Sequence, residues 1–211
     1  MTLESVGKER VKQALTDTAK FLDSINNHTL AAINRGESLN QVLHTLKLDQ
    51  ELLKVSVHIT WSLLAFLIGF SNVFVLFSSQ KPYLRPVYDD PHFIVHNLWR
   101  LYCGWWDFNP AHLRPVKDSD LSQEICQLTG GVEKIVRRVH VLADKGQLDL
   151  AVQLVEYALK ADPNRRDSHE AAVKVYELKV QTEVSTMAKG IYRAAKADSE
   201  KFLAKTVKSS L

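Results

Sequence analysis

The segment 82–115 is the feature that most constrains how this chain can fold. It reads PYLRPVYDDPHFIVHNLWRLYCGWWDFNPAHLRP and holds three of the four tryptophans, three of the six tyrosines and five of the six prolines. Because aromatic side chains bury large apolar areas, such a segment is either the nucleus of a core or an interface. Asp90 is a suitable N-cap and Pro91 suits the first helical position, so a helix is predicted from there to Cys103, where Gly104 can end it.

The predicted helix carries apolar residues at helical spacing, which defines the side expected to face a core. These residues are Phe93, Leu98 and Leu101. A turn follows, closed by the turn-forming pair Asn109-Pro110 and carrying Trp105, Trp106 and Phe108.

Helical spacing also covers most of the remaining chain, and almost no strand-like alternation is found outside residues 55–80. We therefore predict an all-α fold. The expected helical regions are 7–34, one that begins at Ser38, one that begins at Asp118 or Ser119 and ends at Gly130-Gly131, 132–145, 148–161, and a last region from 168 to about 207 with a fraying tail from 196.

Each expected helix has an apolar stripe. In the long first helix the stripe consists of Val11, Leu15, Leu22, Ile25 and Ile33, with Phe21 beside it. The helix that ends at Gly130 carries Leu121, Ile125 and Leu128, and the last region carries Met187 and Ile191 in its second half.

Residues 132–163 have the spacing of a tetratricopeptide-type helix hairpin. The matching residues are Gly146, Ala151, Val155, Ala158 and Pro163. Only one such repeat is clear, and a solenoid needs about three. The sequence therefore predicts a helical hairpin inside a larger domain, with a tetratricopeptide-like adaptor as an alternative function; an adaptor would be a monomer with an open concave face.

The aromatic segment 82–115 resembles the signature of the alkyl sulfatase dimerisation domain. Further similarity lies in the sequences GKERV, NHTL, TGG and MAKG, which begin at residues 7, 27, 129 and 187. The resemblance implies a domain that pairs two subunits and follows a metallo-β-lactamase-type catalytic domain. In that family the catalytic domain holds two zinc ions in a His-x-His-x-Asp-His cluster and hydrolyses alkyl sulfate esters.

The chain lacks that cluster, since no two of its histidines stand two residues apart. We therefore expect a chain that begins just past the catalytic domain, binds no cofactor, forms a homodimer and is inactive alone. Whether it is an enzyme stays open, because the alternative is a fragment of an active linear primary-alkylsulfatase, a sulfuric ester hydrolase, truncated by its gene model.

Residues 55–80 divide the expected domain into an N-terminal helical part, 1–54, and a remainder, 81–211. The segment contains no Asp, Glu, Lys or Arg, which is typical of a transmembrane helix. Two other interpretations are a buried helical hairpin and a translated intron. The intron interpretation is favoured because Val55-Ser56 and Gln80 are compatible with splice-site codons, and because removing the segment restores the continuity of the family's chain. A cDNA that keeps these codons would contradict it.

The candidate site residues lie in the aromatic segment: Tyr88, Trp99, Arg100, Tyr102, Trp105 and Trp106. They are expected to line a substrate entry or the dimer seam, because a guanidinium suits a sulfate and aromatic rings suit an alkyl chain. The alternative is structural: the tryptophans pack the core and Arg100 forms an ion pair. His92 and His96 stand four residues apart on one helix, but a zinc site needs three or four ligands, so solvated or capping histidines are expected.

Composition limits the remaining classes. A net charge of +3 with mixed signs does not fit a nucleic-acid-binding surface. The two cysteines, Cys103 and Cys126, are expected to be free thiols in a reducing compartment. No signal peptide is apparent at the N-terminus. A soluble intracellular location is expected, with membrane attachment through residues 55–80 as the alternative.

Overall fold

The computed structural model describes residues 7–46 and 81–209, and every secondary-structure element in these ranges is helical. The prediction of an all-α fold is confirmed. The described chain forms two compact units. The first unit comprises Met1–Pro86 and Pro91–Asn109, and the second comprises Val87–Asp90 and Pro110–Leu211. The apolar segment 55–80 lies outside the described residues. In the described ranges no helix is both long enough and apolar enough to span a membrane.

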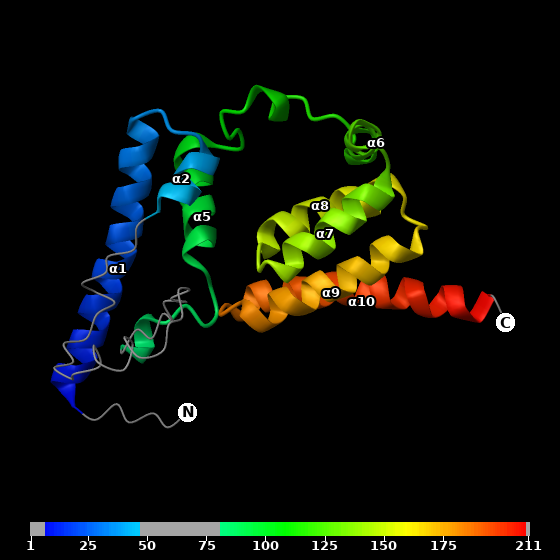
Figure 1. Ribbon diagram of the computed structural model, residues 1–211. Helices are drawn as coiled ribbons and strands as arrows, with labels where there is room; N and C mark the ends of the chain where they lie inside the picture. Colours follow the sequence, from blue (N-terminus) through cyan, green and yellow to red (C-terminus); the bar gives the residue numbers. More distant parts are fainter. Residues whose placement is uncertain (1–6, 47–80, 210–211) are drawn as a thin grey trace, which may run out of the picture. The chain divides into compact units, whose positions relative to one another are not determined.

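The first unit packs a long helix against a shorter one. Its elements are α1 (Lys8–Asn34), α2 (Leu39–Thr45), the 3₁₀ turn η1 (Pro82–Leu84) and α5 (Pro91–Cys103). Helix α1, blue in Figure 1, lies beside the green α5, with α2 packed on both. The core consists of Phe21, Ile25, Ala32, Val42, Leu84, Val95 and Trp99.

The stripes predicted for α1 and α5 are only partly correct. In α1 the core side carries Phe21 and Ile25, as expected, but Leu15 is 67% exposed. In α5 the buried residues are Pro91, Val95 and Trp99. The predicted Leu101 is 71% exposed, so the helix is rotated relative to the expectation. Apolar residues occur around most of α5, and the bulkiest of them, Trp99, defines the buried side.

A buried carboxylate joins α1 to η1. Asp17 accepts hydrogen bonds from Lys81 Nζ and from the Tyr83 hydroxyl, each at 2.8 Å. The bond from Lys81 comes first among the causes that lower the pKa of Asp17 below its ordinary value, followed by the bond from Tyr83. These two bonds hold helix α1 to η1 and to Lys81, the residue directly before it.

Replacing Asp17 by asparagine is expected to destabilise the first unit at neutral pH by about 1–3 kcal/mol, because the partly buried Lys81 loses its charged acceptor. The folded-state pKa of Asp17 is lowered. Its contribution is therefore complete above the unfolded pKa and is lost as the pH falls through the lowered one. Urea unfolding followed by tryptophan emission should show a difference from the native chain at pH 7 that shrinks near about pH 3. The exposed Asp23→Asn is the control; an equal loss in both variants would contradict the assignment.

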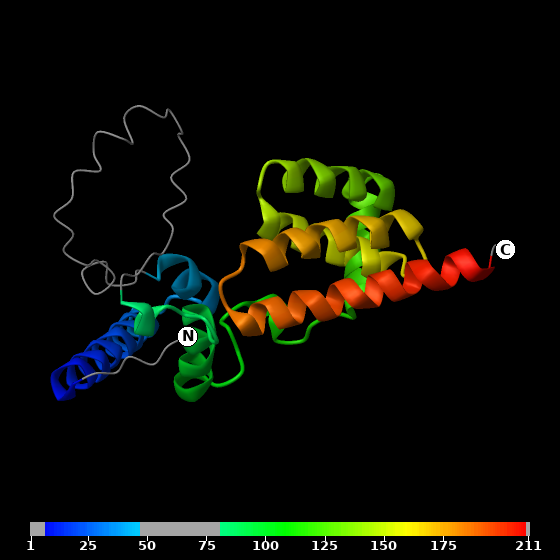
Figure 2. The ribbon, with the colours of Figure 1, turned by 90° about the horizontal axis from the view of Figure 1, so that it is seen from below.

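The second unit is a stack of five helices. They are α6 (Asp118–Thr129), α7 (Val132–Asp144), α8 (Leu148–Ala161), α9 (Arg166–Thr182) and α10 (Thr186–Ser209), preceded by the turn η2 (Pro110–His112). Helices α7 and α8 form the predicted hairpin, in which Ala151, Val155 and Ala158 are fully buried. Helices α9 and α10 lie side by side in both Figure 1 and Figure 2 and form a second hairpin.

Two predictions for this unit are wrong in detail. The last helical region is two helices, broken at residues 183–185 and continuous through Gly190. Met187 and Ile191 are exposed. Helix α6 buries Ser122 and Cys126 and exposes Leu121 and Leu128. Small buried residues in α6 allow a close approach to α8, which explains why its leucines lie outside.

The break before α10 is fixed by a segment far away in the sequence. The Thr186 N–H donates to the Val87 carbonyl at 2.7 Å, and the Met187 N–H donates to the Tyr88 carbonyl at 3.2 Å. The Ser185 hydroxyl also donates to the Tyr88 carbonyl, at 2.9 Å, and accepts from the Ala188 N–H at 3.2 Å. Three N–H groups that a helix start leaves without intrahelical partners are thus satisfied. These bonds place Val87–Asp90 in the second unit.

Candidate functional site

The C-terminal end of α5 and the turn after it form a compact aromatic cluster. Trp99 is 1% exposed and donates its indole N–H to the Trp106 carbonyl at 3.0 Å. The Trp106 indole N–H donates to the Asn109 carbonyl at 3.1 Å. The ring of Phe108 stands edge-on to both indoles, with centroids 5.0 Å from Trp99 and 5.3 Å from Trp106.

Two backbone positions with positive φ make this cluster fit together. Gly104, with φ 79°, ends α5 as predicted. Phe108 has φ 68°, a conformation that is uncommon outside glycine, and it places the ring between the two indoles. The turn predicted at residues 105–110 is therefore present. Trp99 is buried in the core of the first unit, and Trp106 in the turn is half-buried against Phe108.

The other candidate residues of α5 and of the turn after it are exposed. Trp105 is 74% exposed, and Tyr102 and Arg100 are also exposed. Leu101 lies next to them and is exposed too, which the sequence analysis missed because its spacing indicated the core. Arg100, Leu101, Tyr102 and Trp105 together are called the exposed aromatic edge below. It combines a permanent positive charge with apolar area.

Tyr88 does not belong to this group. It lies in Val87–Asp90, which is part of the second unit, and its side chain is 72% exposed while its carbonyl group accepts hydrogen bonds at the start of α10. The structure therefore divides the six candidates into two packed tryptophans, three exposed residues on α5 and the turn, and one residue of the other unit.

Comparison with known proteins identifies the family. The family model described as alkyl sulfatase dimerisation matches residues 78–201, more than half of the chain. The chain belongs to the alkyl sulfatase dimerisation family. The match begins at residue 78, within the last three residues of the apolar segment 55–80, and contains α5, the aromatic turn and most of the second unit. The resemblance inferred from the aromatic segment is confirmed.

Curated relatives of this dimerisation domain are alkylsulfatases. The chain is 25% identical over 179 residues to an (R)-specific secondary-alkylsulfatase from a Pseudomonas species, covering 84% of this chain and 23% of that protein. It is 23% identical over 183 residues to the alkyl/aryl-sulfatase BDS1 of Saccharomyces cerevisiae, covering 86% of this chain and 24% of the yeast protein. The chain thus spans about a quarter of the length of these relatives.

A solved structure has the same fold. The stereoselective inverting sec-alkylsulfatase Pisa1 from Pseudomonas sp. superposes with a TM-score of 0.73 at 22% identity, covering 90% of this chain and 26% of that one. The superposition covers 90% of this chain, whereas the family model matches residues 78–201. The likeness of fold therefore extends to the N-terminal helices.

The described residues of the dimerisation domain do not offer a zinc site. Within residues 7–46 and 81–209, no three His, Cys, Asp or Glu side chains are grouped so that they could hold a metal ion. His92 and His96 are both on the exposed side of α5. Partial desolvation of its ring, and then the neighbouring His92, lower the pKa of His96. Cys103 and Cys126 are free thiols, and burial raises the pKa of both.

The second unit contains a buried charge that the sequence analysis did not detect. Lys179 on α9 is 8% exposed, and its ammonium group pairs with Asp149 at 2.8 Å and with Glu183. It also lies 5.3 Å from the centre of the Tyr192 ring. Burial alone would lower the pKa of Lys179, but the bonds to Asp149 and Glu183 outweigh it and raise the pKa above its ordinary value. Glu183 stands four residues further along the chain, but Asp149 lies on α8, 30 residues earlier, so the local sequence indicates only one of the two partners.

Proposed function

We propose that this chain is a subunit-pairing module of an alkyl sulfatase-like hydrolase and carries no catalytic group itself. The observation that supports the proposal is the family match over residues 78–201 on a chain whose described residues hold no metal-ligand cluster. In this proposal the zinc chemistry belongs to a separate catalytic domain of the kind found in the family.

Size-exclusion chromatography with light scattering tests the pairing. The purified chain is expected to have twice the monomer mass of 23.9 kDa at micromolar concentration. A mass of one chain across the accessible concentration range would contradict pairing and would favour the tetratricopeptide-like adaptor. The observation in favour of that second candidate is the second hairpin, α9–α10, which stacks on α7–α8.

The absence of catalysis is tested separately with dodecyl sulfate as substrate and zinc in the buffer. Zinc-dependent release of sulfate by the purified chain would contradict the proposal. The remaining candidate, a fragment of an active linear primary-alkylsulfatase, is favoured by the chain's spanning about a quarter of its relatives. Genomic sequence upstream that encodes a His-x-His-x-Asp-His cluster would support it.

We further propose that the exposed aromatic edge faces the entry to the active site in a complete enzyme. Arg100 would attract the sulfate group, while Tyr102 and Trp105 would contact the alkyl chain. The exposure of these side chains beside a hydrogen-bonded aromatic cluster supports this role. Tyr88, which lies in the second unit, remains a candidate for the same role on its exposure alone.

The domain limits also remain a proposal. Residues 1–54 and 81–211 would form one dimerisation domain interrupted by residues 55–80. The position of Leu46 and Leu84 in a single core cluster supports this division, because the chain leaves and re-enters the same packed region. We also propose that the protein is soluble and intracellular. In a further proposal, the interrupting segment 55–80 derives from a translated intron.

A further inference from the structure

The N-terminal half of α1 carries an apolar stripe that the described residues of its own unit leave uncovered. Val11 and Leu22 are each 45% exposed, and Leu15 is 67% exposed. The first buried residue of α1 is Asp17, more than two turns from the helix start. Among the described elements, those packed against α1 are α5, η1 and α2. Helical segments of this length are marginal in water without tertiary packing, so the bare turns of α1 need a partner surface.

The exposed stripe continues directly into the core. Apolar or small residues recur along α1 at alternating intervals of four and three, the spacing of a two-helix seam. They are Val11, Leu15, Thr18, Leu22, Ile25, Thr29 and Ala32. The last three are buried within the first unit, whereas the first four are exposed or half-buried. One side of a single helix is thus packed at its C-terminal end and bare at its N-terminal end.

We propose that the bare half of this stripe is the seam on which α1 of a second copy packs, antiparallel, about a two-fold axis between Leu15 and Thr18. The inference rests on the proposed pairing function and assigns it a surface. In this register Val11 lies opposite Leu22 of the second copy, and Leu15 lies opposite Thr18. Seam positions alternate between those followed by an interval of four and those followed by an interval of three. Both facing pairs combine one position of each kind, as antiparallel packing of such repeats requires. The two-fold axis makes the surface complementary to itself.

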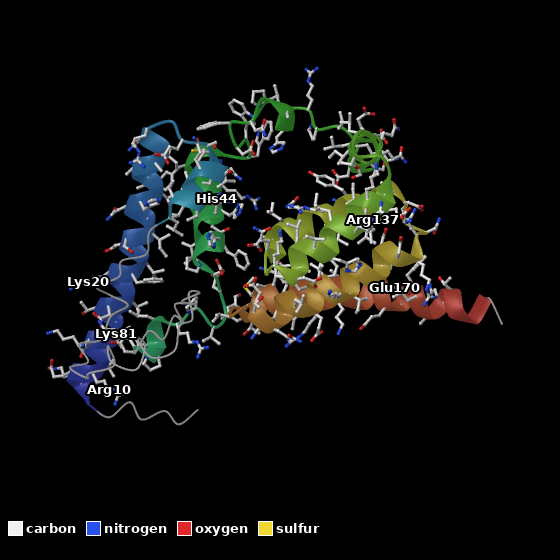
Figure 3. The ribbon with its side chains drawn as sticks, in the orientation of Figure 1. Arg10, Lys20, His44, Lys81, Arg137 and Glu170 are labelled. Atoms are coloured by element: carbon white, nitrogen blue, oxygen red, sulfur yellow. The ribbon has the colours of Figure 1, made fainter. Side chains whose placement is uncertain are left out.

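The residues beside the seam are compatible with close approach. On one flank of the seam the nearest residue of the second copy to Lys12 is Ala19. On the other flank the nearest residue of the second copy to Ala14 is Phe21. No like charges meet, and the small alanines leave room for the longer side chains. The charged residue Lys20 is on the opposite side of α1, where Figure 3 shows it projecting away from the unit. The self-complementary spacing of the stripe, together with the proposed pairing function, makes a second α1 the occupant of this surface.

Disulfide trapping tests the register in the full chain with both native cysteines replaced by alanine. A Leu15→Cys chain mixed with a Thr18→Cys chain should form a covalent heterodimer under mild oxidation, because facing residues of a seam meet the distance limits of a disulfide. The matched control mixes Gln13→Cys with Lys20→Cys. These positions have the same offset from the axis but lie on the opposite side of α1, and no heterodimer is expected. Equal trapping in the two mixtures, or none in either, would overturn the register.

A charge substitution tests the seam without cysteines. Leu15→Asp is expected to raise the dissociation constant of the dimer on the order of 100-fold, since it places two carboxylates in an apolar interface. Gln13→Asp adds the same charge on the far side of the same helix and should leave the constant unchanged. Circular dichroism at 222 nm should show that both variants stay helical.

The outcomes separate the two proposals. If the native chain is monomeric, the pairing function itself fails. If the native chain is dimeric and Leu15→Asp dimerises as tightly as Gln13→Asp, pairing stands but its surface lies elsewhere, which overturns the present inference. If Leu15→Asp alone is monomeric and the Leu15–Thr18 trap forms, the seam is established.

Discussion

Replacing Trp99 by alanine is expected to unfold the first unit while the second unit stays folded. Trp99 is 1% exposed and is the largest side chain in its core, and truncating a buried tryptophan costs about 3–5 kcal/mol. The variant also leaves the Trp106 carbonyl without the indole N–H that donates to it at 3.0 Å. A small unit has little stability in excess of such a loss, because small cores bury a low fraction of their surface.

The two units can be followed separately in this experiment. All the tryptophans in the described residues, Trp99, Trp105 and Trp106, lie in the first unit, whereas the second unit holds Tyr88, Tyr157, Tyr176 and Tyr192. In Trp99→Ala the emission of the remaining tryptophans should lose its cooperative thermal transition. Far-ultraviolet circular dichroism should retain the transition of α6 to α10.

Trp105→Ala is the matched control, since it removes the same side chain from an exposed position in the same segment. Its effect on the free energy of unfolding is expected to stay within about 0.5 kcal/mol. Trp99→Phe should fall between the two, because it keeps an aromatic ring but loses the N–H donor. If Trp99→Ala melted like Trp105→Ala, the aromatic cluster would not be the nucleus of the first unit.

Replacing Lys179 by alanine is expected to lower the stability of the second unit by about 2–4 kcal/mol. The substitution leaves the largely buried Glu183 without its cation and removes the ammonium group that lies over the Tyr192 ring. The effect should be nearly constant from pH 6 to 9. The folded-state pKa of Lys179 is raised, so its contribution is complete below the unfolded pKa and is lost only as the pH rises through the higher one.

Lys174→Ala is the control for Lys179→Ala. Lys174 also lies on α9 and also pairs with an aspartate at 2.8 Å, but both partners of the Lys174–Asp144 pair are largely exposed. Exposed pairs contribute about 0–1 kcal/mol. Urea unfolding followed at 222 nm should therefore separate the two variants clearly. Equal losses would show that the burial of Lys179 has no energetic consequence.

The sequence predicted most helix limits because their signals are local. Pro91 and Gly104 bound α5, and the hairpin α7–α8 follows its small residues Ala151 and Ala158. The buried side of each helix was harder to predict than its limits. On α5 apolar residues occur on more than one side, and on α6 the core takes Ser122 and Cys126 because α8 approaches closely. Which side is buried depends on the neighbouring helix and not on periodicity alone.

The candidate site was predictable as a segment but not as individual roles. Aromatic content identified residues 82–115, yet the separation of packed Trp99 and Trp106 from exposed Tyr102 and Trp105 depends on the positive φ of Phe108. The break before α10 depends on Val87 and Tyr88, about a hundred residues earlier in the chain. Neither the positive φ of Phe108 nor the break before α10 is indicated by the residues next to it in the sequence.

The bonds from Val87 and Tyr88 to the first turn of α10 have a consequence for how the chain can be divided. The backbone passes between the two units at residues 86–87, 90–91 and 109–110. A proteolytic nick between α5 and α6 would therefore not free the second unit from its neighbour, because the upstream fragment would still supply the backbone acceptors that start α10. A transferable gene segment has to begin before Val87 to encode a complete second unit, and the family match starting at residue 78 does so.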